Sequence, residues 1–412
     1  MKLGINGLGR IGKLTLWHHV ARKYFSEIVV NLGREVGTSF NDLAEYIEKD
    51  STYGWLPVWL YGHRANRVIE NINEKDKTMI IDGVKVKFLM NNRNPKDIEW
   101  KEEGVRLVID CTGKFRDPTK EADDPKGSVR GHLVAGAEKV IVSAPFKIKN
   151  KDRSLPDDII TMIYGINEEM YHPEKHRIIS SASCTTTCLA YMIKPLLDYF
   201  GAERILSAAM VTVHATTSSQ SILDRVPKEG EKDLRRARSV FNNIILTTTG
   251  AAEALSLVIP EMKKVGFMAE SVRVPLTTGS LIILTINIQD ESIDNHINKD
   301  LINQIYKEAA ETKYKGYLIF STEQNVSTDI IGYPKAAAII EGKETHTRTA
   351  TAKVDLTKAC VGLPTEDLNK IARSQIEIPI TQVVVYGWYD NELASYTHMM
   401  GDLTVYIAEK MI

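Results

Sequence analysis

Residues 2–12 read KLGINGLGRIG, and this stretch decides the fold of the first half of the chain. The opening apolar run predicts a short buried strand, and the following letters form a G-x-G-x-x-G turn. Apolar residues then recur at helical spacing through residue 21, and residues 27–31 (EIVVN) predict a second strand. Strand, glycine turn, helix and strand in this order make a βαβ unit.

Each glycine of the turn has a physical task at a dinucleotide site. Gly7 permits the tight turn, Gly9 lets the backbone approach a pyrophosphate, and Gly12 lets helix and strand pack closely. The helix that follows offers free N–H groups and a partial positive charge to phosphates. The alternative is a glycine turn in an ordinary βαβ unit. The strand–turn–helix context favours dinucleotide binding.

The end of the second strand bears on which dinucleotide is bound. An NAD site usually has an acid there, which hydrogen-bonds the ribose 2′-hydroxyl and repels a 2′-phosphate. This chain has Asn31 and Leu32, with Arg34 and Glu35 just beyond. Arg34 and Arg93 could supply positive charge near the ribose. In the alternative, Arg34 is a solvated loop charge and Asn31 alone serves the ribose. We therefore expect NAD or NADP as cofactor, with NADP use favoured by the missing acid at Leu32.

The remaining apolar segments divide the chain into two parts. Short strands are predicted at 107–110, 140–143 and 160–164 with helices between some of them, which indicates a Rossmann-type doubly wound parallel sheet. Beyond residue 183 the predicted strands are longer and rich in β-branched residues, which indicates an α+β catalytic domain with a mostly antiparallel sheet. These longer strands are 207–214, 272–274, 280–288 and 381–386. We predict an α/β fold with a dinucleotide-binding domain over 1–183 and a catalytic domain over 184–386.

The composition excludes several classes of protein. The 412 residues carry 52 Lys+Arg against 53 Asp+Glu, which argues against a dedicated nucleic-acid binder. No uncharged apolar stretch is long enough to span a membrane. Four cysteines are too few for a disulfide framework, and they lack the second close pair of a structural zinc site. We expect a cytoplasmic protein with no metal site.

Cys184 is the candidate nucleophile. Residues 183–188 read SCTTTC and precede an apolar helical run, so Cys184 falls near a helix N-terminus, where the dipole and free N–H groups favour a thiolate. The alternative is a buried structural cysteine with hydroxyl caps. His214 follows at the end of a predicted strand and could act as the base and acid of such a nucleophile.

Two further stretches could bind anions. Arg273 lies in VRVP, and an arginine inside an apolar strand needs a partner, either a buried ion pair or an anionic substrate. Residues 247–250 read TTTG and precede a predicted helix. That helix start is either a second phosphate site or simply an N-cap.

Taken together, these motifs resemble one family, the phosphorylating glyceraldehyde-3-phosphate dehydrogenases. Seven stretches in the family's order carry the resemblance: INGLGRIG at 5–12, KDSTYG at 49–54, SASCTTTCLA at 181–190, TVHATT at 212–217, TTTGAAEAL at 247–255, VRVP at 272–275 and WYDNE at 388–392. The resemblance implies an NAD(P)-dependent oxidoreductase that converts glyceraldehyde 3-phosphate and inorganic phosphate into 1,3-bisphosphoglycerate. The reaction would pass through a cysteine thioester and be reversible, serving glycolysis and gluconeogenesis.

The resemblance also implies a role for each matched residue. Cys184 would be the nucleophile and His214 its base. The other expected contacts are Thr217 and Arg273 to the substrate phosphate; Ser183, Thr185, Thr249 and Gly250 to inorganic phosphate; the backbones of Arg10 and Ile11 to the cofactor pyrophosphate; and Thr112, Ser143 and Asn391 to the nicotinamide side or a ribose.

The family resemblance extends to assembly. It implies a homotetramer, in which the segment holding Arg225, Arg235, Arg236 and Arg238 runs along a subunit interface beside the cofactor. It also implies that residues 387–412 form a final helix that completes the dinucleotide-binding domain.

Some features depart from the family. Thr187 and Tyr191 stand where the family usually has Asn and Pro, and Leu32 replaces the acid that selects NAD. Extra residues near 57–80, 121–130 and 344–378 have no assigned function; the last two segments are predicted to be polar surface elaborations. An erythrose-4-phosphate dehydrogenase or a non-phosphorylating relative is the nearest alternative. A nucleotide- or RNA-binding protein on an inactive scaffold is a remote one, which the presence of the candidate catalytic residues opposes.

Overall fold

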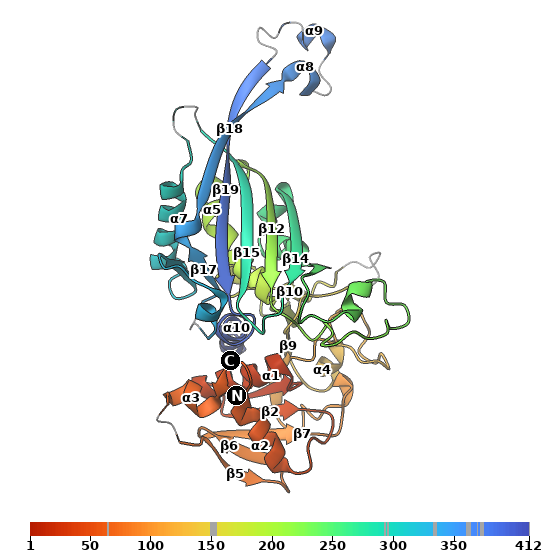
Figure 1. Ribbon diagram of the computed structural model, residues 1–412. Helices are drawn as coiled ribbons and strands as arrows, with labels where there is room; N and C mark the ends of the chain where they lie inside the picture. Colours follow the sequence, from red (N-terminus) through yellow and green to blue (C-terminus); the bar gives the residue numbers. More distant parts are fainter. Residues whose placement is uncertain are drawn as a thin grey trace.

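The computed structural model describes residues 1–63, 66–148, 155–291, 294, 296–332, 336–359, 364–368, 370 and 375–411. Two large sheets organise these residues, and Figure 1 shows one sheet above the other, with both chain termini lying near their junction. The first sheet takes its strands from residues 2–180 and the second from residues 205–389. This arrangement confirms the predicted α/β fold; the domain limits 1–183 and 184–386 remain a prediction.

The first sheet is parallel over most of its width. Its strand order is β10-β11-β9-β8-β1-β2-β7-β6-β5, and every pair from β10 to β7 is parallel. Its strands are β1 Lys2–Asn6, β2 Glu27–Asn31, β5 Ile69–Asn73, β6 Thr78–Ile81, β7 Val84–Leu89, β8 Val105–Asp110, β9 Lys139–Val142, β10 Ile159–Thr161 and β11 Ile178–Ser180. The chain leaves β1 toward β2 on one side and returns to β8 on the other. Ligands bind at such a topological switch point.

Helices and one small hairpin accompany this sheet. They are α1 Arg10–Arg22, α2 Phe40–Glu48, α3 Leu56–Tyr61, α4 Arg130–Val134 and the two-stranded pair β3 Lys49–Asp50 with β4 Gly54–Trp55. The extra residues near 57–80 form α3, β5 and most of β6, and β5–β6 is an antiparallel edge of the sheet. The predicted strand at 160–164 is shorter than expected and ends at Thr161.

The second sheet is mixed, with antiparallel pairs in the majority. Its order is β13-β14-β12-β15-β19-β17-β16, and β18 pairs with β19. Its strands are β12 Ile205–His214, β13 Ile245–Thr248, β14 Gly266–Arg273, β15 Ser280–Gln289, β16 Leu318–Ser321, β17 Ala338–Glu341, β18 His346–Asp355 and β19 Gln375–Tyr389. Its helices are α5 Cys184–Phe200, α6 Ala251–Val258, α7 Lys299–Glu311, α8 Leu356–Ala359 and α9 Thr365–Leu368. Short 3₁₀ turns lie at Pro95–Asp97, Glu168–Met170, Leu234–Ala237, Pro260–Lys264, Ser327–Ile330 and Gly342–Glu344.

The segment 344–378 is largely a projecting arm, so the predicted polar surface elaboration contains paired strands. β18 pairs with β19 from His346–Val384 to Asp355–Gln375, whereas β15 pairs with β19 only from Ile380 onward. The outer half of the arm is therefore a two-stranded ribbon. In Figure 1 it stands away from the body, with α8 and α9 near its tip. Strand β19 is also longer than the predicted strand at 381–386.

The C-terminal segment of the described residues packs on the first sheet. A π-helical turn, Leu393–Thr397, follows β19 and leads into α10, His398–Glu409, so the final helix begins later than residue 387. Several apolar residues of this segment belong to the hydrophobic core that packs on the first sheet: Leu393, Met400, Leu403, Ile407 and Ala408. Within the described residues, no helix is long and apolar enough to cross a membrane.

Helix α1 lies between the first sheet and α10 and is buried on nearly all sides, including two histidines. His19 is 1% exposed, and neither ring nitrogen has a hydrogen-bond partner among the described residues. Burial lowers the pKa of His19 to about 3. Burial likewise lowers the pKa of His18, whose ring contacts the Leu393 carbonyl.

These histidines predict acid sensitivity. Because the folded pKa of His19 lies below its ordinary value, its contribution to stability is complete above pH ~6.5 and is lost as the pH falls toward 3. The wild-type protein should lose unfolding free energy between pH 6.5 and pH 5. We expect this loss to be smaller by about 2 kcal/mol in His19→Leu. Urea unfolding at both pH values checks this, with the exposed His63→Leu as control. An unchanged difference between the two pH values in His19→Leu would contradict it.

Candidate active site

The helix α5 begins at the candidate nucleophile. Ser183 is its N-cap, with extended backbone and a side-chain oxygen that accepts a hydrogen bond from the Thr186 N–H at 3.1 Å. Cys184 is therefore the first helical residue, half-buried at the helix N-terminus as predicted. Cys188 lies one turn further on and is fully buried against Met192.

Parallel pairing of β12 with β14 brings two candidates together. The register places His214 beside Arg273 at the ends of these strands. The His214 Nε2 atom lies 3.6 Å from Cys184 Sγ, while Nδ1 lies 2.6 Å from the Ala215 carbonyl oxygen. An imidazole with its proton on Nδ1 donates to this carbonyl and leaves the Nε2 lone pair facing the thiol. The Arg273 Nη1 atom contacts His214 Nδ1 and donates to the same carbonyl at 3.2 Å.

Asn391 completes this group. Its Nδ2 lies 3.3 Å from His214 Nε2 and 3.9 Å from Cys184 Sγ. The buried Ser280 hydroxyl donates to Asn391 Oδ1 at 2.7 Å and accepts from the Ala215 N–H at 3.0 Å. Ser280 therefore orients the amide so that its N–H groups face the thiol and the imidazole. Sequence reasoning missed Ser280, because a serine at the start of a predicted strand carries no signal of its own.

Burial governs the charge of the reactive pair. It raises the pKa of the Cys184 thiol, against the opposing effects of the Arg273 charge, the Asn391 side chain and the Thr185 backbone. It also lowers the pKa of His214 to about 3, and the nearby Arg273 adds to this. In both groups burial favours the neutral form. Burial therefore opposes the thiolate that the helix N-terminus and the Arg273 charge favour.

Arg273 lacks the carboxylate partner that one interpretation of its sequence position required. Among the described residues it forms no ion pair, and its Nε is buried without a hydrogen-bond partner. Burial lowers its pKa. A half-buried guanidinium with an unused donor next to the thiol suits an anionic group of a ligand.

The other hydroxyl candidates are less closely gathered. The Thr185 hydroxyl lies 2.9 Å from the Tyr389 hydroxyl, which also contacts Thr212. Thr217 bonds within its own loop to Ser219 and Gln220. The Thr249 side chain accepts from the Ala251 N–H at 3.2 Å, and Gly250 is exposed at the start of α6. In the described part of the chain, no hydrogen bond joins Thr217, Thr249 or Gly250 to Cys184, His214 or Arg273.

The glycine turn has the geometry that a dinucleotide needs. Gly7 has φ +93° and donates its N–H to the Asn31 carbonyl at 2.8 Å. A Cβ on Gly12 would lie 1.9 Å from the Gly7 oxygen, so helix and turn can pack only with glycine there. A Cβ on Gly9 would meet nothing within 4 Å, which leaves its surroundings open to a ligand. Ile11 follows in the first turn of α1 and is half-buried.

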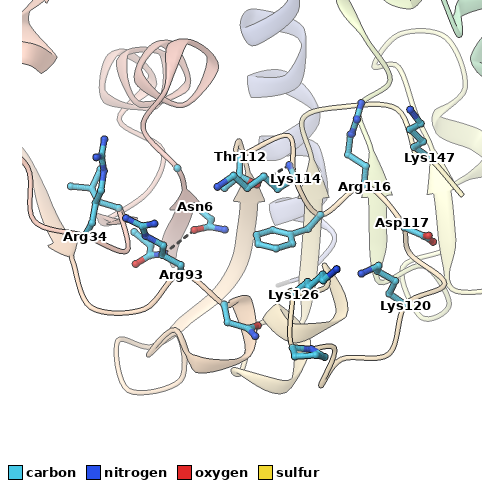
Figure 2. Close-up of a pocket in the computed structure, with 17 residues that line it drawn as sticks. Asn6, Arg34, Arg93, Thr112, Lys114, Arg116, Asp117, Lys120, Lys126 and Lys147 are labelled. Carbon is cyan, nitrogen blue, oxygen red and sulfur yellow. Dashed lines mark hydrogen bonds between the residues drawn. The ribbon is translucent and has the colours of Figure 1, made fainter. Parts of the chain in front are cut away.

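Beside this turn lies a cleft of about 720 Å³ at the switch point (Figure 2). Asn31 donates to Asn6 Oδ1 at 2.8 Å and to the Asn92 carbonyl at 3.0 Å, which leaves its buried Oδ1 without a partner among the described residues. That orphan acceptor suits a ligand hydroxyl. Other predicted cofactor residues also line the cleft: Gly7, Leu32, Arg34, Arg93 and Thr112. Ser143 lies just beyond β9 and donates its N–H to the Asp110 carbonyl.

The KDSTYG and WYDNE stretches bind each other across the two sheets. Arg10 pairs with Asp50 and with Glu392, whose carboxylate lies 3.2 Å from the arginine Nε. The Tyr53 hydroxyl donates to Asp390 Oδ1 at 2.5 Å. The side chain of Arg10 therefore holds Glu392, the residue directly after Asn391, and only the Arg10 backbone is available to a pyrophosphate. Neither tie was predicted, because they depend on tertiary contacts more than 300 residues apart.

Comparison with known proteins agrees with this geometry. Residues 1–118 match the family described as glyceraldehyde 3-phosphate dehydrogenase, NAD binding domain, and residues 183–360 match the corresponding C-terminal domain. The chain is similar to "Glyceraldehyde-3-phosphate dehydrogenase 2" of Streptomyces avermitilis, with 35% identity over 100% of this chain and 99% of the relative. A Geobacillus stearothermophilus glyceraldehyde-3-phosphate dehydrogenase is also 35% identical, with the same coverage. A Chlamydia pneumoniae relative is 38% identical over 81% of this chain and 86% of its own length.

Full-length similarity of this kind agrees with the seven motifs and with the paired sheets that bring them together. The chain belongs to the glyceraldehyde-3-phosphate dehydrogenase family and is an oxidoreductase that uses a nicotinamide cofactor.

Proposed function

We propose that this protein is the phosphorylating enzyme, which oxidises glyceraldehyde 3-phosphate in the presence of inorganic phosphate to 1,3-bisphosphoglycerate. The observation that carries the proposal is the 3.6 Å contact of Cys184 Sγ with His214 Nε2, beside an arginine with an unused donor. A thiol, a base and a cation at one point suit covalent catalysis on a phosphorylated aldehyde.

The residues act in sequence on the aldehyde carbon. Cys184 Sγ attacks that carbon, and its proton passes through His214 Nε2 to the carbonyl oxygen, which gives a hemithioacetal. His214 then takes the hydroxyl proton as the carbon is oxidised to a thioester. The bound dinucleotide supplies the hydride acceptor for this oxidation. Inorganic phosphate attacks the thioester carbon, and the Cys184 thiolate leaves.

The positions of the phosphates remain proposals from the matched motifs. Arg273 with Thr217 would hold the substrate phosphate, because Arg273 has a free buried donor. Ser183, Thr185, Thr249 and Gly250 would hold the attacking phosphate at the N-termini of α5 and α6. Asn391 would contact the nicotinamide side, since its amide is aimed at the reacting group.

Phosphate dependence tests the proposed reaction. We expect steady turnover of glyceraldehyde 3-phosphate only when inorganic phosphate is present, because the thioester otherwise hydrolyses slowly. Initial rates with and without phosphate, with acyl phosphate trapped by hydroxylamine, measure this. Equal rates in its absence, with 3-phosphoglycerate as the product, would identify a non-phosphorylating enzyme instead. A higher kcat/KM for erythrose 4-phosphate would identify the nearest alternative substrate.

We further propose that NADP is accepted. Leu32, Arg34 and Arg93 line the cleft beside Asn31, whereas Glu35 is exposed, lies 3.6 Å from Lys77 and is not part of the lining. Nothing at the strand end therefore repels a 2′-phosphate. We expect kcat/KM for NADP to be within tenfold of that for NAD or better, since tenfold is ~1.4 kcal/mol.

Two substitutions check the cofactor proposal. Leu32→Asp should shift preference toward NAD, because a carboxylate there bonds the 2′-hydroxyl and repels the phosphate. Arg34→Ala should weaken NADP selectively. Initial rates with both cofactors provide the measurement, and a wild-type preference for NAD of a hundredfold or more would overturn the interpretation of Leu32.

A homotetramer in the cytoplasm is our proposal for the assembly and its location. Large apolar side chains are exposed on the loop between β12 and β13, which is unusual for a free surface. They are Ile222, Leu223, Val226, Leu234, Phe241 and Ile244. Three of the four arginines in this loop pair with acids of the same loop. Cys111, Cys184 and Cys188 are all free thiols, which suits a reducing compartment.

A further inference from the structure

The cleft beside the glycine turn has two basic ends. Figure 2 shows Arg34 and Arg93 at one end and Arg116, Lys120 and Lys147 at the other, with Thr112 between the two ends. The first end adjoins Asn31 and Leu32, where the proposed dinucleotide places its adenosine ribose. The second end is a separate cluster of cations, formed by Lys114, Arg116, Lys120, Lys126 and Lys147.

Within the described part of the chain, most of the cations at this second end have no carboxylate partner. Lys120 pairs with Asp124 at 2.7 Å. The other four cations form no ion pair with any described residue. Among the described residues that line the cleft, Asp117 is the one carboxylate. It accepts hydrogen bonds from the Thr119 N–H at 3.1 Å and from the Thr119 hydroxyl at 2.6 Å. Four cations in one concave site repel each other, and a bound anion offsets that repulsion.

The cluster is held in shape by local hydrogen bonds. Asp124 accepts from the Lys126 N–H at 2.8 Å through its side chain and from the Gly127 N–H at 2.8 Å through its carbonyl. The Ser128 hydroxyl donates to the Lys120 carbonyl at 3.0 Å, which closes the loop. The Lys147 N–H donates to the Arg116 carbonyl at 2.8 Å, which joins the two segments that carry these cations. The site therefore exists before any ligand arrives.

These cations also lie mostly between the two segments that match the family models. The matches cover residues 1–118 and 183–360, so Lys120, Lys126 and Lys147 fall between them. The loop that carries Lys120 and Lys126 overlaps the extra segment 121–130, which sequence analysis left without a function. Its position on the cleft corrects the interpretation of that segment as a mere surface elaboration.

We propose that the second end of the cleft is an anion site separate from the dinucleotide, built for a ligand with phosphate groups. A phosphate ester carries about −1.5 to −2 charges at pH 7, which matches several converging cations. Arg116 can bind two phosphate oxygens at once, while the lysines act as point charges. The ligand is a small phosphorylated compound or inorganic polyphosphate that binds alongside the cofactor.

Calorimetric titration of the full-length enzyme with inorganic pyrophosphate tests this proposal. With NAD saturating, wild type should bind pyrophosphate, and Lys126→Gln/Lys147→Gln should raise its Kd tenfold or more without changing the KM for NAD. Arg34→Ala is the matched control at the other end and should leave the pyrophosphate Kd unchanged. Circular dichroism confirms that each variant folds, and turnover of glyceraldehyde 3-phosphate reports the proposed function independently.

Three outcomes would overturn the proposal. One is the absence of pyrophosphate binding to the NAD-saturated enzyme. Another is pyrophosphate binding to the free enzyme that saturating NAD abolishes, or a higher pyrophosphate Kd in Arg34→Ala. Either result would mean that the anion occupies the dinucleotide's own phosphate positions. The third is loss of pyrophosphate binding when NADP replaces NAD, which would identify the cofactor's 2′-phosphate as the natural occupant. Inorganic phosphate, titrated in parallel, should bind more weakly than pyrophosphate because it carries less charge.

Discussion

Cys184→Ser is expected to lower kcat by more than about a thousandfold, which corresponds to ~4 kcal/mol in activation free energy. A serine hydroxyl at the same helix N-terminus ionises far less readily than a thiol, so the attack on the aldehyde carbon fails. The Gly7–Gly12 turn is untouched, and dinucleotide affinity should therefore be retained. Initial rates with glyceraldehyde 3-phosphate and phosphate, together with a fluorescence titration of the cofactor, measure both expectations.

Cys188→Ser is the matched control for this variant. The Cys188 sulfur lies 3.8 Å from Met192 Sδ and 3.9 Å from the Gly387 carbonyl, so it faces the interior and not the reacting group. Its kcat should stay close to wild type. If Cys184→Ser retained a tenth or more of the wild-type rate, Cys184 would not be the nucleophile.

His214→Asn is expected to lower the rate of hydride transfer by ~10²–10⁴-fold, the usual contribution of a positioned base. The substitution removes the Nε2 lone pair that faces Cys184 Sγ. Because burial keeps the pKa of His214 near 3, the wild-type imidazole is neutral throughout the assay range, and its protonation should not shape the rate between pH 6 and 9. Stopped-flow measurement of the first turnover of reduced cofactor tests this.

The exposed His63→Asn serves as the control and should leave the burst unchanged. Alkylation by iodoacetamide should slow together with the burst in His214→Asn, since the same base assists both reactions. A burst of wild-type rate and amplitude in His214→Asn would remove His214 from the mechanism.

The βαβ unit that starts the first sheet was predictable because its signals are local. The apolar run at 2–6, the glycine turn and the strand at 27–31 each satisfy a rule that holds within a few residues, and all three are confirmed. The arm at 344–378 was not predictable, because its strands pair mainly with each other and lack the one-sided apolar pattern that burial imposes. An exposed ribbon carries alternating small and polar residues, which resemble a surface loop in sequence.

The site shows the same division between local and long-range information. Cys184, His214 and Arg273 were named from motifs, but the proximity of His214 and Arg273 depends on the register between β12 and β14, which no local pattern specifies. Ser280 and Tyr53 act through hydrogen bonds to Asn391 and Asp390, which lie more than 100 positions away. Burial, which sets the charge of the reactive pair, likewise emerges only once the two sheets are packed.

The position of the last helix sets the order in which this protein can be completed during synthesis. Met400, Leu403 and Ile407 of α10 fill the same core as Leu3 and Ile5, which are made long before them. The ribosome still covers α10 while the first sheet and its glycine turn are already outside. The cofactor-binding half therefore waits, with part of its apolar core exposed, until α10 has been made. A stop codon upstream of α10 would leave that early-made half unfinished and exposed to chaperones and proteases.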